Sequence, residues 1–514
     1  MSVLFKSFWS VVFASAQMME PFYQLAKGSP VTAKASVLRP NLKGGIDWLY
    51  LNPLNKHWVM FLTTVLSILF SVQASIASEA MTVQAGASCN TKNGRKLCDP
   101  VWVIDLAVVR SLQTTLVLSG ILVAALLLLN WNRTSGLFSY PCSIASMAWL
   151  LSNSEDLAST LRNIEPNAKI HDVETKLKHK LLTFKEAQSR ASEDVVSVFV
   201  RDKEQPDKSS NGEESSRDLG SDVQAAASAG SIPSSWLARI PWGTAQIFIV
   251  TLLHVALFGV ILSFVLSGND IYAINLLGSD HNKHLTAVKW KFLDGTRFGP
   301  RFFMTILISF LFNPFWEMVE LKVRTMAPYR QLRNRSEKSR YLCTGHLHGV
   351  PFTIVFKALW HRNWYHAFIA FTTVLSYVLL ILIAGVPYNY GQVKDVSFYS
   401  SLVSVIILAI MMAAMVSLLF WHLGNPKMPR DPDNLVNTWL LMCSSRFVEN
   451  YKGRTLSEII EEIKHGHTRF WFRKAFDHEG RERFMIEAEE SLRTQQGQGL
   501  LGPKIDEDLR VMYF

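Results

Sequence analysis

Cysteine and histidine side chains lie close together at Cys343, His346 and His348. Thiolate and imidazole groups are ligands that zinc prefers, and a closed structural zinc site takes four of them. No fourth ligand follows at a spacing typical of such sites. We therefore interpret this cluster as structural, and we expect the chain to bind no metal and no other cofactor.

A titratable side chain, His254, lies in the middle of a long apolar segment. An ionisable residue inside a membrane segment is a functional hypothesis by default. Two interpretations stay open: His254 lines a transport path together with Asn313, or it forms a hydrogen bond with a neighbouring helix. No aspartate or glutamate lies in mid-segment as a proton relay, which favours the hydrogen bond. Lys6 lies near one end of its apolar segment, where its ammonium can reach the membrane surface.

Two carboxylates, Glu317 and Glu320, follow Trp316 at the end of an apolar segment, and Lys322 and Arg324 come next. Hydrolytic carboxylate pairs converge across a cleft, whereas these lie on one helix end. We therefore interpret the group as an interfacial anchor. Nucleophile elbows, phosphate-binding glycine loops, metalloprotease motifs and dinucleotide fingerprints do not occur in a suitable context. The sequence thus predicts a protein that is not an enzyme.

The segments that carry these residues are unusually apolar. The chain has 514 residues with 49% hydrophobic and 18% charged side chains, and its mean hydropathy is +0.15. Soluble proteins contain about a quarter charged residues, and a membrane-spanning helix needs roughly 20 mainly apolar ones. We therefore predict about seven transmembrane helices, at Val3–Met19, Trp58–Ala80, Leu106–Leu129, Ala245–Leu266, Phe302–Met318, His366–Val386 and Leu402–Phe420.

The distribution of Lys and Arg predicts the orientation of these helices. Both are concentrated in 20–56, 131–242, 320–365 and 421–514 and are scarce in the alternating loops. Because cytosolic loops are enriched in Lys and Arg, we expect the N-terminus outside and the C-terminus in the cytosol. We expect lipid as the partner rather than nucleic acid, with the basic run 330–340 either contacting anionic lipid or only enforcing this topology.

Two cysteines, Cys89 and Cys98, fall in an outer loop of this topology, where an oxidising compartment would allow a disulfide between them. The alternative is that both remain free thiols. The N-terminal segment also has a second interpretation, because Lys6, an apolar run and Ala14-Ser15-Ala16 resemble a cleaved signal peptide.

The polar part of the chain divides into a linker and a small structured unit. Residues 201–235 are rich in serine, glycine and charge and lack aromatic side chains before Trp236, so we predict a disordered linker within a cytosolic segment at 156–242. The C-terminal segment, 446–514, is predicted to form a helix followed by a β-hairpin. The apolar face of that helix comprises Leu456, Ile459, Ile460 and Ile463, and the hairpin strands contain Phe470–Phe472 and Arg483–Ile486.

Short sequences recur in the same order in both halves of the chain. Glu20–Leu25 (EPFYQL) resembles Ala327–Leu332 (APYRQL), at an offset of 307. Residues 63–67 and 372–376 are both TTVLS, and a Trp-Leu-Leu sequence follows the last apolar segment of each half. We therefore predict two parallel repeats, with three helices in 1–155 and four in 243–445. The fourth apolar segment has no counterpart in the first repeat, which looks shortened at its start.

These motifs carry a resemblance to a family of multi-pass membrane proteins. EPFYQL, the following basic stretch, the second apolar segment and Tyr140–Leu151 (YPCSIASMAWLL) resemble fungal Spray-like proteins, which share a duplicated domain of unknown function. Phe470–Ile486 is similar to the closing segment of that family. Tyr140 departs from the family, which tends to have aspartate there. The resemblance implies a fungal origin and a link to membrane or calcium homeostasis, and it transfers no catalytic residues.

The sequence therefore predicts an all-α polytopic membrane protein with a small cytosolic helix and β-hairpin at its C-terminus. Our first hypothesis for its function is a non-enzymatic scaffold or homeostasis factor with an unknown protein partner. A transporter or channel is the second, and an accessory protein of a fungal secondary-metabolite pathway is the third. A dry, packed interior would favour the scaffold, and a polar path would favour transport.

Overall fold

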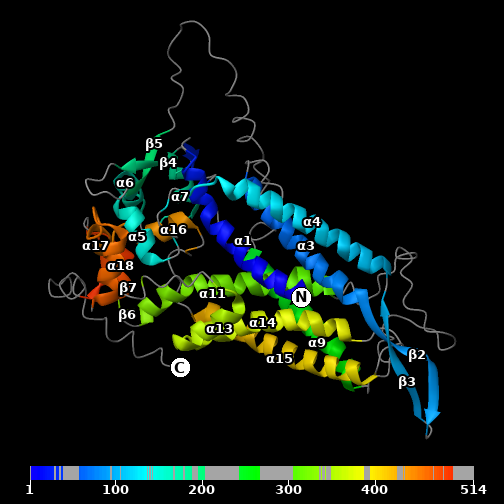
Figure 1. Ribbon diagram of the computed structural model, residues 1–514. Helices are drawn as coiled ribbons and strands as arrows, with labels where there is room; N and C mark the ends of the chain where they lie inside the picture. Colours follow the sequence, from blue (N-terminus) through cyan, green and yellow to red (C-terminus); the bar gives the residue numbers. More distant parts are fainter. Residues whose placement is uncertain are drawn as a thin grey trace.

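The molecule is an elongated bundle of long helices with an α/β domain at one end and a long β-hairpin at the other (Figure 1). The structure is a computed structural model. It describes residues 2–27, 30–33, 36–38, 57–92, 95–104, 106–135, 137, 141, 143–165, 168, 170–177, 180–187, 195–202, 242–266, 305–334, 337–338, 342, 349–386, 394–424, 432, 434–466, 468–477 and 480–489.

Helices form at all seven predicted apolar segments. The first set comprises α1 (Ser2–Leu25), α3 (Trp58–Ala80) and α4 (Leu106–Trp131). The second set comprises α9 (Trp242–Leu266), the π-helical turn η4 (Ile308–Phe312) continued by α11 (Asn313–Asn334), α14 (Trp364–Gly385) and α15 (Lys394–Gly424). Among the described residues, four stretches are long and apolar enough to cross a membrane, which indicates a membrane protein: Trp58–Ala77, Leu106–Trp131, Trp364–Ala384 and Phe398–Phe420.

The two sets of helices pack in the same way. In the first, α3 lies between α1 and α4, and in the second, α14 lies between α11 and α15. Helix α9 packs against α15. Where side chains are described, a hydrophobic core extends through the second set and includes Trp316, Leu379 and Met411.

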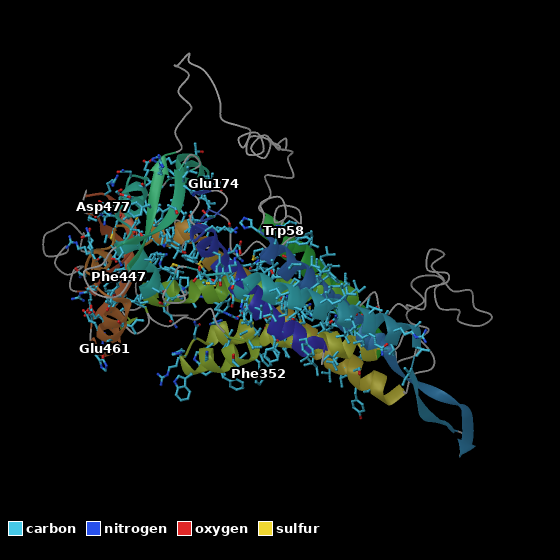
Figure 2. All side chains as sticks on the ribbon, turned by 45° about the horizontal axis from the view of Figure 1, so that its top comes forward. Trp58, Glu174, Phe352, Phe447, Glu461 and Asp477 are labelled. Atoms are coloured by element: carbon cyan, nitrogen blue, oxygen red, sulfur yellow. The ribbon has the colours of Figure 1, made fainter. Side chains whose placement is uncertain are left out.

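A short helix that we did not predict, α13 (Pro351–Trp360), precedes α14 and packs against it. Its buried face carries Ile354 and Ala358, and its opposite face exposes Phe352 and Trp360. Figure 2 shows Phe352 at the outer surface of the bundle. The turn between the two helices places Arg362 at a φ of 55°.

The α/β domain contains two groups of elements that follow the same order along the chain. The first group comprises β1 (Val31–Thr32), α5 (Ile144–Ser152), α6 (Glu155–Arg162), α7 (Ile170–Leu177), β4 (Lys180–Ala187) and β5 (Val195–Asp202). The second comprises β6 (Glu337–Lys338), α16 (Leu435–Leu440), α17 (Arg446–Glu449), α18 (Leu456–His465), β7 (Arg469–Phe476) and β8 (Glu482–Ala488). Each group forms an antiparallel three-stranded sheet, with strand orders β1-β4-β5 and β6-β7-β8. We refer to α1 through β5 as the first unit and to α9 through β8 as the second unit.

Local sequence explains the ends of these elements. Thr455 and Glu458 form a reciprocal capping box at the start of α18, which satisfies backbone N–H groups that have no partner within the helix. In the β7–β8 turn, Gly480 has a φ of +73°, a left-handed conformation that suits glycine. The predicted C-terminal helix and hairpin are confirmed.

The described residues are mostly helical, as the predicted all-α fold requires, but they contain three small sheets where we expected one β-hairpin. The β4–β5 hairpin and helices α6 and α7 occupy most of the described part of 156–242, a segment in which we predicted a linker at 201–235 but no helix or strand. Strand β5 also includes residues 201 and 202 of the predicted linker, and 203–235 lie outside the described residues. The third sheet pairs β2 (Met81–Lys92) with β3 (Arg95–Ile104).

A single hydrophobic core holds the α/β domain together. It includes Leu161 and Val198 from the first unit and Trp439 and Phe472 from the second, all nearly inaccessible to solvent. The ends of two bundle helices also enter this core, through Phe22 of α1 and Tyr329 of α11. The domain is therefore one body to which both units contribute.

Candidate functional site

A polar cluster lies inside the bundle where the two units meet. The ammonium of Lys6 in α1 donates to the backbone carbonyl of Ser309 at 2.7 Å and to its hydroxyl at 3.2 Å. The Ser309 hydroxyl in turn donates to the carbonyl of Ser71 in α3 at 2.9 Å. On the next turns, the Tyr377 hydroxyl of α14 donates to the Glu317 carboxylate at 2.6 Å. We call Lys6, Ser71, Ser309, Glu317 and Tyr377 the inter-unit cluster.

This cluster corrects two expectations. Lys6 is only 4% exposed and is hydrogen-bonded inside the bundle, rather than extending to a membrane surface. Glu317 binds a neighbouring helix, and Trp316 is fully buried, so they are not an interfacial anchor. The reason is tertiary, because the partners of Lys6 and Glu317 lie on helices far away in the sequence.

The local geometry at Ser309 comes from the π-helical turn η4, in which the N–H of Asn313 donates to the carbonyl of Ile308. Such turns are rare in proteins, and those that occur often lie at functional sites. Asn313 and Pro314 follow this turn directly and begin α11. The Asn313 amide is fully buried, and neither its oxygen nor its nitrogen has a hydrogen-bond partner among the described residues.

His254 occupies a different place, between α9 and the η4–α11 helix. Its Nδ1 lies 2.7 Å from the carbonyl of Val250, and its Nε2 accepts a hydrogen bond from the Trp316 indole at 3.3 Å. The imidazole also stacks on Phe312, with 4.1 Å between ring centroids. Since a carbonyl can only accept, the proton lies on Nδ1 and both ring nitrogens have partners. The expected hydrogen bond to a neighbouring helix is therefore present, whereas a role of His254 and Asn313 in transport stays a prediction.

Each unit also buries a glutamate on a bundle helix, α1 in the first unit and α11 in the second. In the first unit, Glu20 lies 2.8 Å from His57 Nδ1 and 2.8 Å from an Arg133 guanidinium nitrogen. Gln24 adds a hydrogen bond of 2.5 Å to the same carboxylate. Burial by itself raises the pKa of Glu20, but the hydrogen bond to His57, the charge of Arg133 and the Gln24 contact outweigh it and hold the pKa below its usual value.

The second unit also buries a glutamate, Glu320, which lies seven residues before Ala327, the residue that pairs with Glu20 at the offset of 307. Glu320 pairs with Arg324 one turn later at 2.5 Å and with His366 Nε2 at 3.4 Å. Because the side chains are almost fully buried, this group is a joint between α11 and α14 rather than the interfacial anchor that we expected.

The two units attach their helices to the α/β domain through equivalent aromatic contacts. Phe22 stacks on Phe184 of β4 at 6.4 Å between centroids. Tyr329 meets Phe472 of β7 edge-on at 5.7 Å. Phe22 and Tyr329 are the third residues of the recurring sequences EPFYQL and APYRQL, so the recurrence reflects a packing contact.

Polar contacts across the domain join the units directly. The Trp149 indole donates to the carbonyl of Arg454 at 2.9 Å. Arg162 donates to the carbonyl of Cys443 at 2.9 Å, and its own carbonyl accepts from Arg483 at 2.6 Å.

In the second unit, the Glu487 carboxylate accepts from the backbone N–H of Arg446 at 2.6 Å, and burial raises the pKa of Glu487 to about 7.

The remaining sequence-predicted residues fall partly outside the described structure. Strand register places Cys89 directly opposite Cys98 in the β2–β3 hairpin, so the backbone brings the two together as a disulfide requires, and the bond itself stays a prediction. Residues 343–348 lie outside the described residues. Among the described residues, no group of histidine, cysteine and carboxylate side chains could hold a metal ion.

Sequence reasoning missed the inter-unit cluster, although a signal was present. Extending the offset of 307 towards the N-terminus pairs Phe8-Trp9 with Phe315-Trp316, and it pairs Lys6 with Asn313. A polar residue at the same place in two otherwise apolar segments indicates a shared internal position.

Two segments of the chain match a protein family. Residues 1–82 and 298–388 match the family described as Protein of unknown function (DUF3433). The first matched segment contains α1 and α3, and the second contains η4, α11 and α14. Two matching segments are consistent with a duplicated domain of unknown function. The match carries no source organism, so a fungal, Spray-like origin stays a prediction. No curated protein and no solved structure matches the chain significantly.

Proposed function

We propose that this protein is a non-enzymatic membrane scaffold, built from two parallel repeats with seven transmembrane helices, that holds the α/β domain at the cytosolic surface for a protein partner. The observation that carries the proposal is the single hydrophobic core of that domain. Helices α1 and α11 enter it directly through Phe22 and Tyr329. A rigid link of this kind suits a protein that fixes a docking domain to a membrane.

The order of elements supports the repeats. Both units contain two consecutive bundle helices, a third bundle helix, three short helices and a β-hairpin, and both add a short strand to that hairpin. The two matched family segments cover corresponding helices, α1 and α3 in the first unit and α11 and α14 in the second. Among the described residues, helix α9 and the short helix α13 occur only in the second unit.

The arrangement along the bundle supports the orientation. The α/β domain lies at one end of the bundle, where α1 and α11 end, and the β2–β3 hairpin projects from the other end (Figure 1). Basic segments favour the cytosolic side. The hairpin would then lie in the outer compartment, where a Cys89–Cys98 disulfide can form. This topology gives an N-terminus outside and a C-terminus in the cytosol.

The surface of the α/β domain supports a protein partner. Helix α18 buries Ile459 and Ile463 and exposes Glu458, Glu461 and Glu462. Helix α7 exposes Glu174 in the first unit, and Figure 2 shows Glu174 and Glu461 at the surface of the domain. Anionic lipid attracts basic segments and repels such acidic faces, so these helices suit a basic protein surface.

Charge reversal tests this function. The chain that carries both Glu461→Lys and Glu174→Lys is expressed in cells that lack the natural gene. We expect this double variant to reach normal abundance but fail to restore the normal growth rate and the normal cytosolic calcium concentration. The matched control variants His254→Gln and Asn313→Ala should restore growth and cytosolic calcium, because a scaffold needs no transport path through these side chains. Full rescue by the double charge reversal would overturn the scaffold.

Transport is the second candidate, and the inter-unit cluster is the observation that favours it. A buried lysine, a π-helical turn and the unpartnered Asn313 amide lie together where the two units meet. Transport predicts flux of a tracer ion through vesicles that contain the purified chain, abolished by His254→Ala. The scaffold predicts the same flux as in protein-free vesicles.

A further inference from the structure

Helix α13 is too short to cross a membrane, yet it lies directly beside a helix that is long enough to do so. Its ten residues, Pro351–Trp360, extend about 15 Å at a rise of 1.5 Å per residue, which is roughly half the thickness of the hydrocarbon core. Residues 361–363 alone separate it from Trp364, where the long apolar stretch of α14 begins. Because α13 also packs against α14, the chain turns back between them, and α13 lies beside the start of that stretch.

Helix α13 lies towards the end of the bundle that carries the α/β domain (Figure 1). The backbone carbonyl of Gly349, just before α13, accepts a hydrogen bond of 3.5 Å from Arg324 of α11. Further along α11, Tyr329 is part of the core of the α/β domain. Helix α13 therefore lies where the long apolar helices meet this domain, which is the level of the lipid head groups if these helices cross a membrane.

The side of α13 opposite its buried face carries large aromatic side chains. Phe352, Phe356 and Trp360 follow one another at intervals of four residues, so they share one side of the helix, and they are 59%, 59% and 87% exposed. The rings of Phe352 and Phe356 meet edge-on, with 5.2 Å between centroids, and Figure 2 shows Phe352 at the outer surface. Trp364, the first residue of α14, is 70% exposed. Aromatic side chains are enriched at both membrane–water interfaces, so this face suits the head-group level.

Two cations border the aromatic face. Lys357 lies on α13 and Arg362 in the turn that follows, and both are exposed. Neither side chain forms an ion pair or a hydrogen bond with another residue that the structure describes. The sequence contains no aspartate or glutamate from 338 through 394, so this part of the chain supplies no carboxylate to pair with them. A short helix with an exposed apolar side and cations at its border is typical of helices that lie in the membrane interface.

We propose that α13 and its turn to α14 bind anionic phospholipid in the leaflet on the side of the α/β domain. The rings of Phe352, Phe356 and Trp360 lie among the head groups and the upper acyl chains, and Lys357 and Arg362 bind acidic head groups. Detergent without lipid gives these two cations no such partner. The proposal goes beyond the scaffold function and rests on its placement in a membrane, not on its protein partner.

The depth of α13 can be measured on the full chain in lipid nanodiscs with a spin label at Phe356→Cys, after subtraction of the signal from the chain without the added cysteine. We expect this label to collide several-fold more often with oxygen, which dissolves in lipid, than with a water-soluble nickel chelate. The control is Phe199→Cys in β5 of the α/β domain, a side chain that is 36% exposed and should show the opposite preference. A label at 356 that meets the chelate as often as the control lies in water, and one that meets neither reagent is covered by protein. Either result would overturn the proposal.

A fluorescent dye at the same cysteine measures which lipid is adjacent. In nanodiscs with equal fractions of two lipids that carry a nitroxide near the top of one acyl chain, we expect phosphatidylserine to quench the dye several-fold more than phosphatidylcholine. Lys357→Gln combined with Arg362→Gln should remove this excess. The charge-matched control is Lys452→Gln combined with Lys474→Gln, at exposed positions of the α/β domain, which should retain it.

Equal quenching by the two lipids in the chain with its natural cations would exclude a preference for anionic lipid at α13. An unchanged excess in the Lys357 and Arg362 double variant would assign the anionic lipid to other cations. Glu174 and Glu461 are unchanged in all these variants, so a failure here leaves the scaffold function to the charge-reversal experiment.

Discussion

Lys6 donates a hydrogen bond of 2.7 Å to the carbonyl of Ser309, a residue 303 positions further along the chain. The bond joins the first helix of the first unit to the π-helical turn of the second. Lys6 is 4% exposed, and a buried ammonium without partners is costly. The two units are therefore held together by polar contacts inside the bundle as well as by the core of the α/β domain.

Replacing this lysine should loosen the contact between the units. Lys6→Met keeps much of the side-chain volume but removes both hydrogen bonds to Ser309, at a cost of about 1–3 kcal/mol. We expect a lower apparent Tm for the purified protein in detergent. Lys357→Met on the exposed side of α13 is the control, and an equal Tm for the two variants would show that the Lys6 contact adds no stability.

The aromatic contact of the second unit should contribute more to stability than that of the first. Phe472 is fully buried and Phe184 only partly, so Phe472→Ala should cost about 3–5 kcal/mol and Phe184→Ala less. Limited proteolysis of the α/β domain in increasing urea measures the difference. Phe199→Ala, at a side chain that is 36% exposed, should have little effect. The reverse order for Phe184 and Phe472 would contradict this account of the core.

Glu487 should make the stability of the α/β domain depend on pH. Burial raises its pKa to about 7, so the folded state holds a proton that the unfolded state loses at a lower pH. Its contribution to stability is therefore complete below about pH 4.5 and is lost as the pH rises through about 7. Glu487→Gln should remove this loss and stabilise the domain at pH 8 by on the order of 2–3 kcal/mol.

Urea unfolding at pH 5 and pH 8 measures this effect. Glu482→Gln, an exposed position on the same strand, is the control and should leave the pH profile unchanged. An identical pH profile for Glu487→Gln and the natural sequence would show that this carboxyl is not responsible.

The β2–β3 hairpin should contain a disulfide between Cys89 and Cys98. Strand register places them opposite one another, and closing a loop of this size stabilises a hairpin by about 2–3 kcal/mol. Peptide mapping without reductant should recover the two cysteines in one linked fragment. Alkylation of both thiols in unreduced protein would exclude the bond, whereas Cys443, a buried thiol, should react only after unfolding.

Several elements could be predicted from the sequence because their signals are local. The segments at 58–80 and 106–131 are long and apolar, and in lipid a backbone must satisfy its own hydrogen bonds, so they form helices. Helix α18 and the β7–β8 hairpin follow from the spacing of their apolar residues. The β4–β5 hairpin had a comparable signal, since Val196, Val198 and Val200 alternate with other residues, and we did not use it.

Only the tertiary structure decided which polar and apolar side chains are covered. Lys6 near the end of an apolar run suggested a lysine that reaches the membrane surface, and it is buried because Ser309 and Ser71 come from other helices. Helices α4 and α15 are similarly apolar, but only α15 packs against α9. Hydropathy measures the preference of a segment for lipid or protein over water and does not distinguish between those two surroundings. The amino-acid sequence therefore determined the helices, and the packing of distant segments determined the inter-unit cluster and which side of α4 stays exposed.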